Sequence, residues 1–122
     1  MTTAVRALRG ATTIAEDDEP HVYERVITLL ETMCARNGVA HDDIISILFT
    51  ATNDIHSVFP AAAARQMGLG DVPLICAQEL TIIGGTERCV RVMMHLTTDR
   101  SRADLQHVYL EGAIGLRDDL PG

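Results

Sequence analysis

The sequence has very few aromatic residues, which make up 3% of its 122 residues and include no tryptophan. A core built from this chain is therefore aliphatic, and few rings are available to stack on bases or sugars. Basic residues are also scarce, 10 against 17 acidic ones, and the net charge of −7 argues against nucleic acid or an anionic membrane as a partner. A small anion stays possible, because a local group of arginines is enough to bind it.

Long hydrophobic runs are absent as well. No stretch approaches the ~20 apolar residues of a membrane-spanning helix, and the N-terminus has no hydrophobic signal core. Cys34, Cys76 and Cys89 are odd in number and lack the spacing of a metal site, which predicts reduced thiols in the cytoplasm. The histidines show no metal-ligand spacing either, so no metal is expected.

What is present predicts one domain over residues 1–122, large enough to bury roughly two-thirds of its unfolded surface. Five apolar residues at helical spacing predict one long helix from Pro20 to Asn37. Asp17 or Asp18 can cap its start, and Gly38 suits its end. The helix should cover one face of a sheet with its apolar side.

The remaining elements are mostly strands. Alternation over residues 4–10 predicts a strand with Arg9 and Leu8 on opposite faces. We expect further elements as follows: a strand covered on both faces at 44–52, a short helix at 60–68, two strands within 72–96, a helical turn at 103–105, a strand at 107–116 and a mobile tail at 117–122. This order indicates an α+β fold with about five strands in a mixed sheet and one main helix, whose uncovered face is buried by self-association.

The stretch 72–96 carries the least expected charges. Two apolar runs flank Gly84 and Gly85, which suggest a turn between directly paired antiparallel strands. Glu79 ends the first run and Arg91 lies inside the second. Charged groups are almost never buried without a partner. From these residues alone, a solvent-facing Arg91 and a strand-end Glu79 are the simpler interpretation.

Three kinds of chemistry remain open from the residues. Cys76 could be a nucleophile with His107 as its base, and Glu79 with Glu111 could form a carboxylate pair, although no spacing supports either. The third is a site for a small dicarboxylate, in which arginine forks bind carboxylates and a glutamate accepts from a hydroxyl. The residues in or beside apolar segments that suit it are Arg9, Arg65, Glu79, Arg91, Tyr109 and Arg117.

Several short stretches, in the same order across nearly the whole chain, resemble the small monofunctional chorismate mutases of the Bacillus type. These stretches are LRGATT at 8–13, AT-D-H-VFPA over 51–61, CAQE at 76–79, GG at 84–85, CVRVMM at 89–94, HVYLE at 107–111 and LR-DL at 116–120. The resemblance implies a homotrimer assembled around a barrel-like core, with sites between subunits, that converts chorismate to prephenate toward phenylalanine and tyrosine without any cofactor.

The resemblance also implies residue roles. Arg91 would reach the ether oxygen of chorismate, Glu79 would accept from the ring hydroxyl, and Arg9 and Tyr109 would hold carboxylate. The remaining implied pocket residues are Phe59, Cys76 and Leu116, with Arg65 and Arg117 at the mouth. Two positions depart from the family pattern: Ala62 replaces a lysine near the entrance, and Ile75 replaces a threonine before the cysteine.

Two rival functions belong to other classes. One is a trimeric, non-catalytic module that has kept a small-anion pocket, and intact Arg9, Glu79, Arg91 and Tyr109 speak against such decay. The other is a hydrolase that depends on Cys76.

Overall fold

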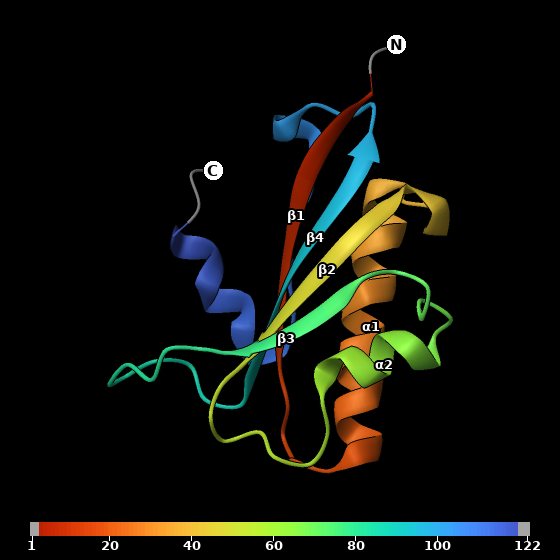
Figure 1. Ribbon diagram of the computed structural model, residues 1–122. Helices are drawn as coiled ribbons and strands as arrows, with labels where there is room; N and C mark the ends of the chain where they lie inside the picture. Colours follow the sequence, from red (N-terminus) through yellow and green to blue (C-terminus); the bar gives the residue numbers. More distant parts are fainter. Residues whose placement is uncertain (1–2, 120–122) are drawn as a thin grey trace.

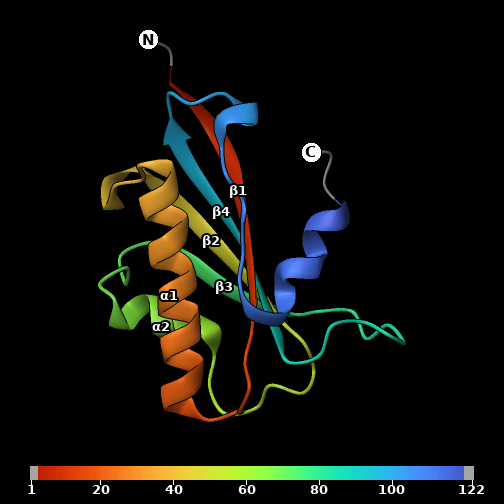
Figure 2. The ribbon, with the colours of Figure 1, turned by 180° about the vertical axis from the view of Figure 1, so that it is seen from behind.

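A computed structural model describes residues 3–119 as a five-stranded sheet with its two α-helices on one side (Figures 1 and 2). The strands are β1 (Ala4–Thr13), β2 (Ile44–Ala51), β3 (Leu74–Gln78), β4 (Cys89–Thr98) and β5 (Val108–Tyr109). The helices are α1 (Glu19–Asn37) and α2 (Pro60–Gln66), with short 3-10 helices η1 (His41–Asp43), η2 (Arg102–Asp104) and η3 (Glu111–Asp119). The predicted mixed α+β sheet is confirmed.

The strand order is β3-β2-β4-β1-β5, with β4 antiparallel to both β1 and β2. The predicted direct pairing of β3 with β4 across Gly84 and Gly85 is wrong, because β2 lies between them. Helix α2 is the crossover that returns the chain to pair β3 parallel to the outer edge of β2. The long loop after β3 then leads past β2 to β4.

Helix α1 forms as the sequence predicts. The Asp18 side chain accepts a hydrogen bond from the His21 backbone N–H, and Pro20 occupies the first turn. Gly38 ends the helix in the left-handed conformation, with φ of 61°. The predicted apolar positions are the buried ones: Val22, Val26, Leu29, Leu30 and Met33.

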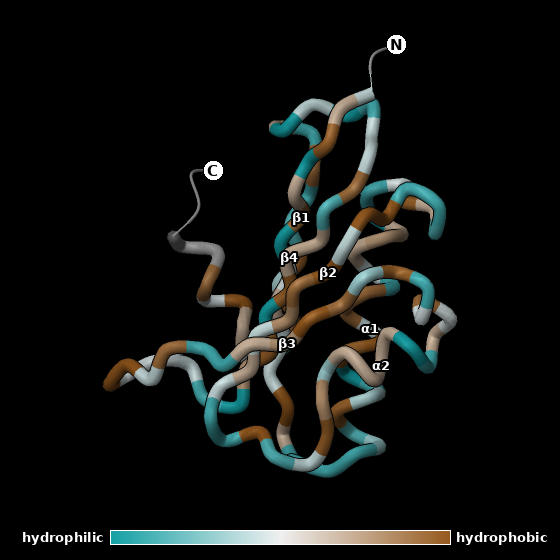
Figure 3. The backbone as a smooth tube through the Cα atoms, viewed as in Figure 1, coloured by the Kyte–Doolittle hydropathy of each residue, from teal (hydrophilic) through white to brown (hydrophobic). Residues whose placement is uncertain are grey.

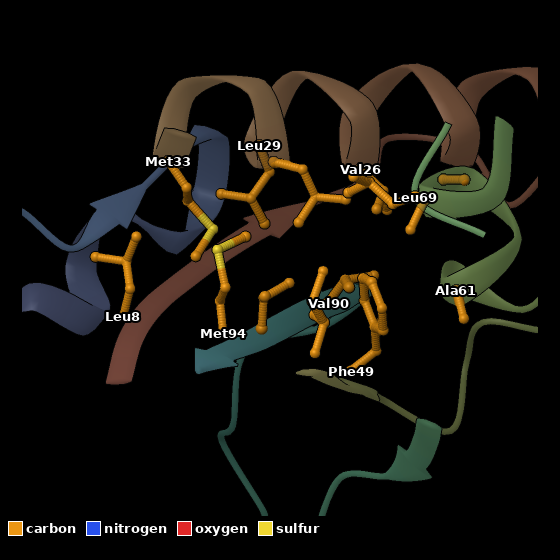
Figure 4. Packing of buried hydrophobic residues seen from close by; sticks show 14 of the residues in the cluster. Leu8, Val26, Leu29, Met33, Phe49, Ala61, Leu69, Val90 and Met94 are labelled. Carbon is orange, nitrogen blue, oxygen red and sulfur yellow. The ribbon is translucent and has the colours of Figure 1, made fainter. Parts of the chain in front are cut away.

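The core lies between α1, α2 and one face of the sheet (Figure 4). Leu8, Phe49 and Val90 come from three neighbouring strands and are fully buried there. The other face, which we call the open face, leaves large apolar side chains uncovered in the single chain. Ile45 and Leu48 are exposed, so the prediction that β2 is covered on both faces is wrong for one copy of the chain.

The predicted strand at 107–116 is mostly wrong. Strand β5 has only two residues, and the chain then turns into η3. The alternation of Val108, Leu110 and Ile114 imitates a strand, but Glu111 has a positive φ of 53° and ends the extended run. The predicted tail reaches beyond the described residues at 120–122, whereas the backbone of 117–119 completes η3.

Candidate active site

The open face carries a pocket of about 270 Å³ beside the middle of β4. Its side chains share one face because their positions are directly opposite in the sheet register: Arg91 faces Ala11 and Thr50, and Ala11 faces Tyr109. The lining side chains are those of Arg9, Ala11, Leu48, Thr50, Glu79, Arg91, Met93 and Tyr109. Four residues predicted from the sequence, Arg9, Glu79, Arg91 and Tyr109, therefore come together here.

Arg91 and Glu79 form an ion pair on this face, with 3.2 Å between Nε of Arg91 and Oε2 of Glu79. The Thr50 hydroxyl donates to the same carboxylate oxygen at 3.1 Å, and the Leu80 backbone N–H donates to Oε1. The two side chains are 38% and 27% exposed. Arg91 lies on the open face and Glu79 directly follows the end of β3, as the simpler interpretation expects, but the two charges form an ion pair instead of being solvated separately.

Arg9 lies on β1 and is supported by a residue whose role the sequence did not reveal. The Arg9 backbone N–H donates to Nδ1 of His107 at 2.9 Å, just before β5 begins to pair with β1. Burial, and then the charge of Arg9, lowers the pKa of His107 below its ordinary value. Neutral His107 is thus the form that accepts this bond. No spacing in the sequence signals a contact between residues 98 positions apart.

A second hollow, of about 570 Å³, lies along the outer edge of the sheet between β3 and the loop that precedes α2. Phe59, which is 70% exposed, and Cys76 line it. Cys76 faces Phe49 in the register and so points to the covered side of the sheet, away from Arg91. The structure thus separates Phe59 and Cys76 from the charged pocket within one chain.

The loop beside this hollow is held by Asp17. Its carboxylate accepts from the backbone N–H groups of His56 and Ser57, at 2.7 and 3.1 Å. A hydrogen bond from the Ser57 side chain and these backbone bonds lower the pKa of Asp17. The sequence offered Asp17 only as an alternative helix cap, and this support of the loop was missed.

The remaining predicted site residues are placed differently. Leu116 is half-buried beside Tyr109, packed against Ala11, Cys89 and Ala113. Arg65 is exposed on the last turn of α2 and lines neither hollow. Arg117 belongs to η3, and its side chain lies outside the described part of the chain.

The pattern of charges and the fold match one known family. The family model described as chorismate mutase type I matches residues 5–120. The chain belongs to this family. It is 41% identical to chorismate mutase AroH of Bacillus subtilis (strain 168) over 117 residues, 95% of this chain and 92% of that protein. It is 39% identical to chorismate mutase AroH of Thermus thermophilus over 117 residues, 95% and 96% of the two chains.

Among solved structures, a chorismate mutase from Clostridium thermocellum superposes with a TM-score of 0.86 and 45% identity, covering 88% of this chain and 96% of that one. The predictions of a Bacillus-type chorismate mutase, an isomerase of aromatic amino acid biosynthesis, are confirmed by these relatives. A non-catalytic module is not favoured. No helix within residues 3–119 is long and apolar enough to cross a membrane.

The other chemistries left open by the sequence find no support in this chorismate mutase fold. Cys76 and His107 lie at opposite edges of the sheet, on β3 and just before β5, so they cannot act as nucleophile and base in one chain. Glu111 pairs with Arg25, away from Glu79. Within the described residues, no three His, Cys, Asp or Glu side chains are grouped to hold a metal ion.

Proposed function

We propose that this chain converts chorismate to prephenate at a site formed by the charged pocket of one copy and the apolar hollow of another. The observation that carries the proposal is the fixed Arg91–Glu79 pair with Arg9 and Tyr109 on the same open face. The reaction is an intramolecular Claisen rearrangement: the ether C–O bond breaks while a C–C bond forms, and no proton moves. It therefore needs no nucleophile, metal or acid–base pair, only conformer selection and charge stabilisation.

Each charged residue has a role that fits its chemistry. Arg91 donates to the ether oxygen, which gains negative charge as the bond breaks. Glu79 accepts from the ring hydroxyl and holds the Arg91 guanidinium by their ion pair. Arg9 and Tyr109 bind carboxylate, and Leu116, packed beside Tyr109, closes that side of the pocket. Arg117 adds positive potential at the mouth.

A homotrimer supplies the missing wall of the site. Phe59 and Cys76 contact the substrate from a neighbouring copy, and Arg65, on the helix that begins directly after Phe59, adds positive potential there. Exposed apolar side chains support association. Val5 and Ile75 on the open face are 62% and 63% exposed, and the loop after β3 has an apolar tip, visible in Figure 3, where Ile82 and Ile83 are exposed. Surfaces of this kind mark protein–protein contacts.

The cytoplasm is the compartment we propose for this enzyme. Its three cysteines are all free thiols in the structure, as expected where the environment is reducing.

An assay of the purified protein tests this function. Chorismate absorbance should disappear in a saturable way, with prephenate as the product. Sedimentation equilibrium at micromolar concentration should give three times the 13.3 kDa chain mass. Tight chorismate binding without turnover would favour the non-catalytic module, and a monodisperse monomer with full activity would contradict the shared site.

A further inference from the structure

Arg25 of α1 makes a long-range contact with the start of η3. Its Nη1 atom lies 2.5 Å from Oε1 of Glu111, which is 86 positions away in the sequence. The Arg25 side chain is only 19% exposed, and Glu24 also accepts hydrogen bonds from its Nε and Nη2 atoms. One half-buried guanidinium thus joins the main helix to the turn where the chain leaves the sheet.

That turn has an unfavourable backbone. Glu111 has a φ of 53°, a strained conformation that side-chain-bearing residues rarely adopt. Directly after it, the Gly112 backbone N–H donates to Oγ1 of Thr13 at 2.9 Å. A Cβ atom at Gly112 would lie 2.8 Å from the same oxygen, so only glycine fits this approach. Such a turn persists only where several contacts fix it.

The direction of η3 depends on this turn. Figures 1 and 2 both show η3 on the side of the sheet opposite α1, over the end of the open face. Ala113 is fully buried there, and Leu116 and Tyr109 pack in the same cluster with Ala11 and Cys89. Tyr109 precedes Glu111 by two residues and also lines the charged pocket. A change of the turn therefore affects Tyr109, which lines the pocket, and Leu116, which packs in the same cluster as Tyr109.

We propose that Arg25 is a positioning residue: its ion pair with Glu111 holds the strained turn, and the turn places Tyr109 and Leu116 at the pocket. This inference rests on the proposed function, since the pocket is the chorismate site proposed above. Arg25 itself lies in another hollow, beside Arg88, and does not line that pocket. Its loss should weaken substrate binding rather than the chemical step, because the Arg91–Glu79 pair stays in place.

The test compares variants of Arg25 and Glu111 by steady-state kinetics with chorismate. Arg25→Ala and Glu111→Gln should each raise KM about three- to fivefold, the range of a partly exposed ion pair, with kcat within about twofold of the wild type. The charge-swapped double variant, Arg25→Glu with Glu111→Arg, should recover at least half of the lost affinity. Glu24→Gln is the matched control, because it removes the other carboxylate on Arg25 without touching η3.

A second readout does not depend on catalysis. Hydrogen–deuterium exchange of peptides covering residues 107–116 should accelerate in Arg25→Ala, while the C-terminal half of α1 keeps its protection. Glu111→Gly relieves the backbone conformation but removes the ion pair. Because glycine adopts a positive φ without strain, the turn depends less on the ion pair, and KM in Glu111→Gly should rise less than in Glu111→Gln. A KM rise in Glu111→Gly at least as large as in Glu111→Gln would overturn the inference.

Two other outcomes would also overturn the inference: equal KM increases in Glu24→Gln and Arg25→Ala, or unchanged exchange over 107–116 in Arg25→Ala. If the wild type fails to convert chorismate while hydrogen–deuterium exchange over 107–116 is still faster in Arg25→Ala, the ion pair does hold the turn and only the proposed function fails.

Discussion

The two faces of the sheet are built from the same strands and differ in almost every property. On the covered face, Leu8, Phe49 and Val90 are 0% exposed and are packed against helices (Figure 4). On the open face, their strand neighbours Arg9 and Arg91 are half-buried, and Arg91 is held by an ion pair with Glu79. Period-2 alternation thus places a packed core and a charged pocket back to back. A substitution should therefore affect stability on one face and catalysis on the other.

The largest effect should come from the covered face. Leu29 is fully buried between α1 and the sheet, so Leu29→Ala should lower the free energy of unfolding by about 3–5 kcal/mol. Urea denaturation measures this loss, and kcat of the protein that remains folded should be unchanged. Ile83→Ala, at a fully exposed loop position, is the control and should cost less than about 0.5 kcal/mol when the protein is dilute enough to be monomeric. A similar loss of unfolding free energy in Leu29→Ala and Ile83→Ala would contradict the assignment of Leu29 to the core and Ile83 to the surface.

The open face should show the opposite response. Arg91→Ala should lower kcat about 10²–10³-fold, roughly 3–4 kcal/mol, because the ether oxygen gains its charge only in the transition state. Arg91→Lys keeps the charge without the planar fork and should be partly active. Steady-state kinetics, with circular dichroism to confirm folding, measure both. A folded Arg91→Ala variant with a raised KM and an unchanged kcat would mean that Arg91 binds the substrate without stabilising the transition state.

The pH dependence of stability tests a contact near the β5 edge of the sheet, the hydrogen bond from the Arg9 backbone to His107. The pKa of His107 is lowered in the folded protein, so folding favours the neutral form. Its contribution to stability is therefore complete above the unfolded pKa of about 6.5 and is lost as the pH falls through the lower, folded pKa. His107→Asn keeps an acceptor near the Nδ1 position without titrating.

Urea unfolding at pH 7.5 and at pH 5 measures this effect. The wild type should lose more stability between the two pH values than His107→Asn does. His56→Asn, in an exposed loop, should behave like the wild type. An identical pH dependence in His107→Asn and the wild type would mean that protonation of His107 does not weaken the fold, which would contradict its lowered pKa.

The smallest effect should come from Cys76, which lines the apolar hollow. The rearrangement needs no nucleophile, so Cys76→Ala should keep most of the activity, whereas a loss beyond about 10³-fold would indicate a chemical role. Burial raises the pKa of Cys34 and Cys89, so iodoacetamide should label both slowly at neutral pH. Mass spectrometry measures the labelling of Cys34 and Cys89. The same method applied during turnover tests Cys76, and an adduct of substrate on Cys76 would contradict this account.

The sequence predicts the parts of the fold that depend on local pattern. Helix α1, its caps at Asp18 and Gly38, and the opposite faces of Leu8 and Arg9 follow from spacing and capping chemistry. The pairing of β3 does not, because a glycine pair resembles a hairpin turn whether or not another strand lies between. The turn at Glu111 was missed because its conformation depends on Arg25 and Thr13, which are distant in sequence.

The candidate site was predicted in part. The residues alone place Arg9, Glu79, Arg91 and Tyr109 among those that suit a dicarboxylate site, and the family resemblance implies the individual role of each. The separation of Cys76 from Arg91 follows from strand register, which no single segment encodes. The supports at His107 and Asp17 are contacts between distant segments, and no local signal marks them.

The most direct test of the shared site mixes two inactive variants. Arg91→Ala removes the charged half, and Phe59→Glu places a repelling carboxylate in the apolar half at an exposed position. When the two chains are co-expressed and assemble at random, about one site in four combines two intact halves, so activity should return to roughly a quarter of the wild type. Each variant alone should stay nearly inactive. Mixed oligomers, confirmed by native mass spectrometry, that remain as inactive as the separate variants would contradict a site built from two copies of the chain.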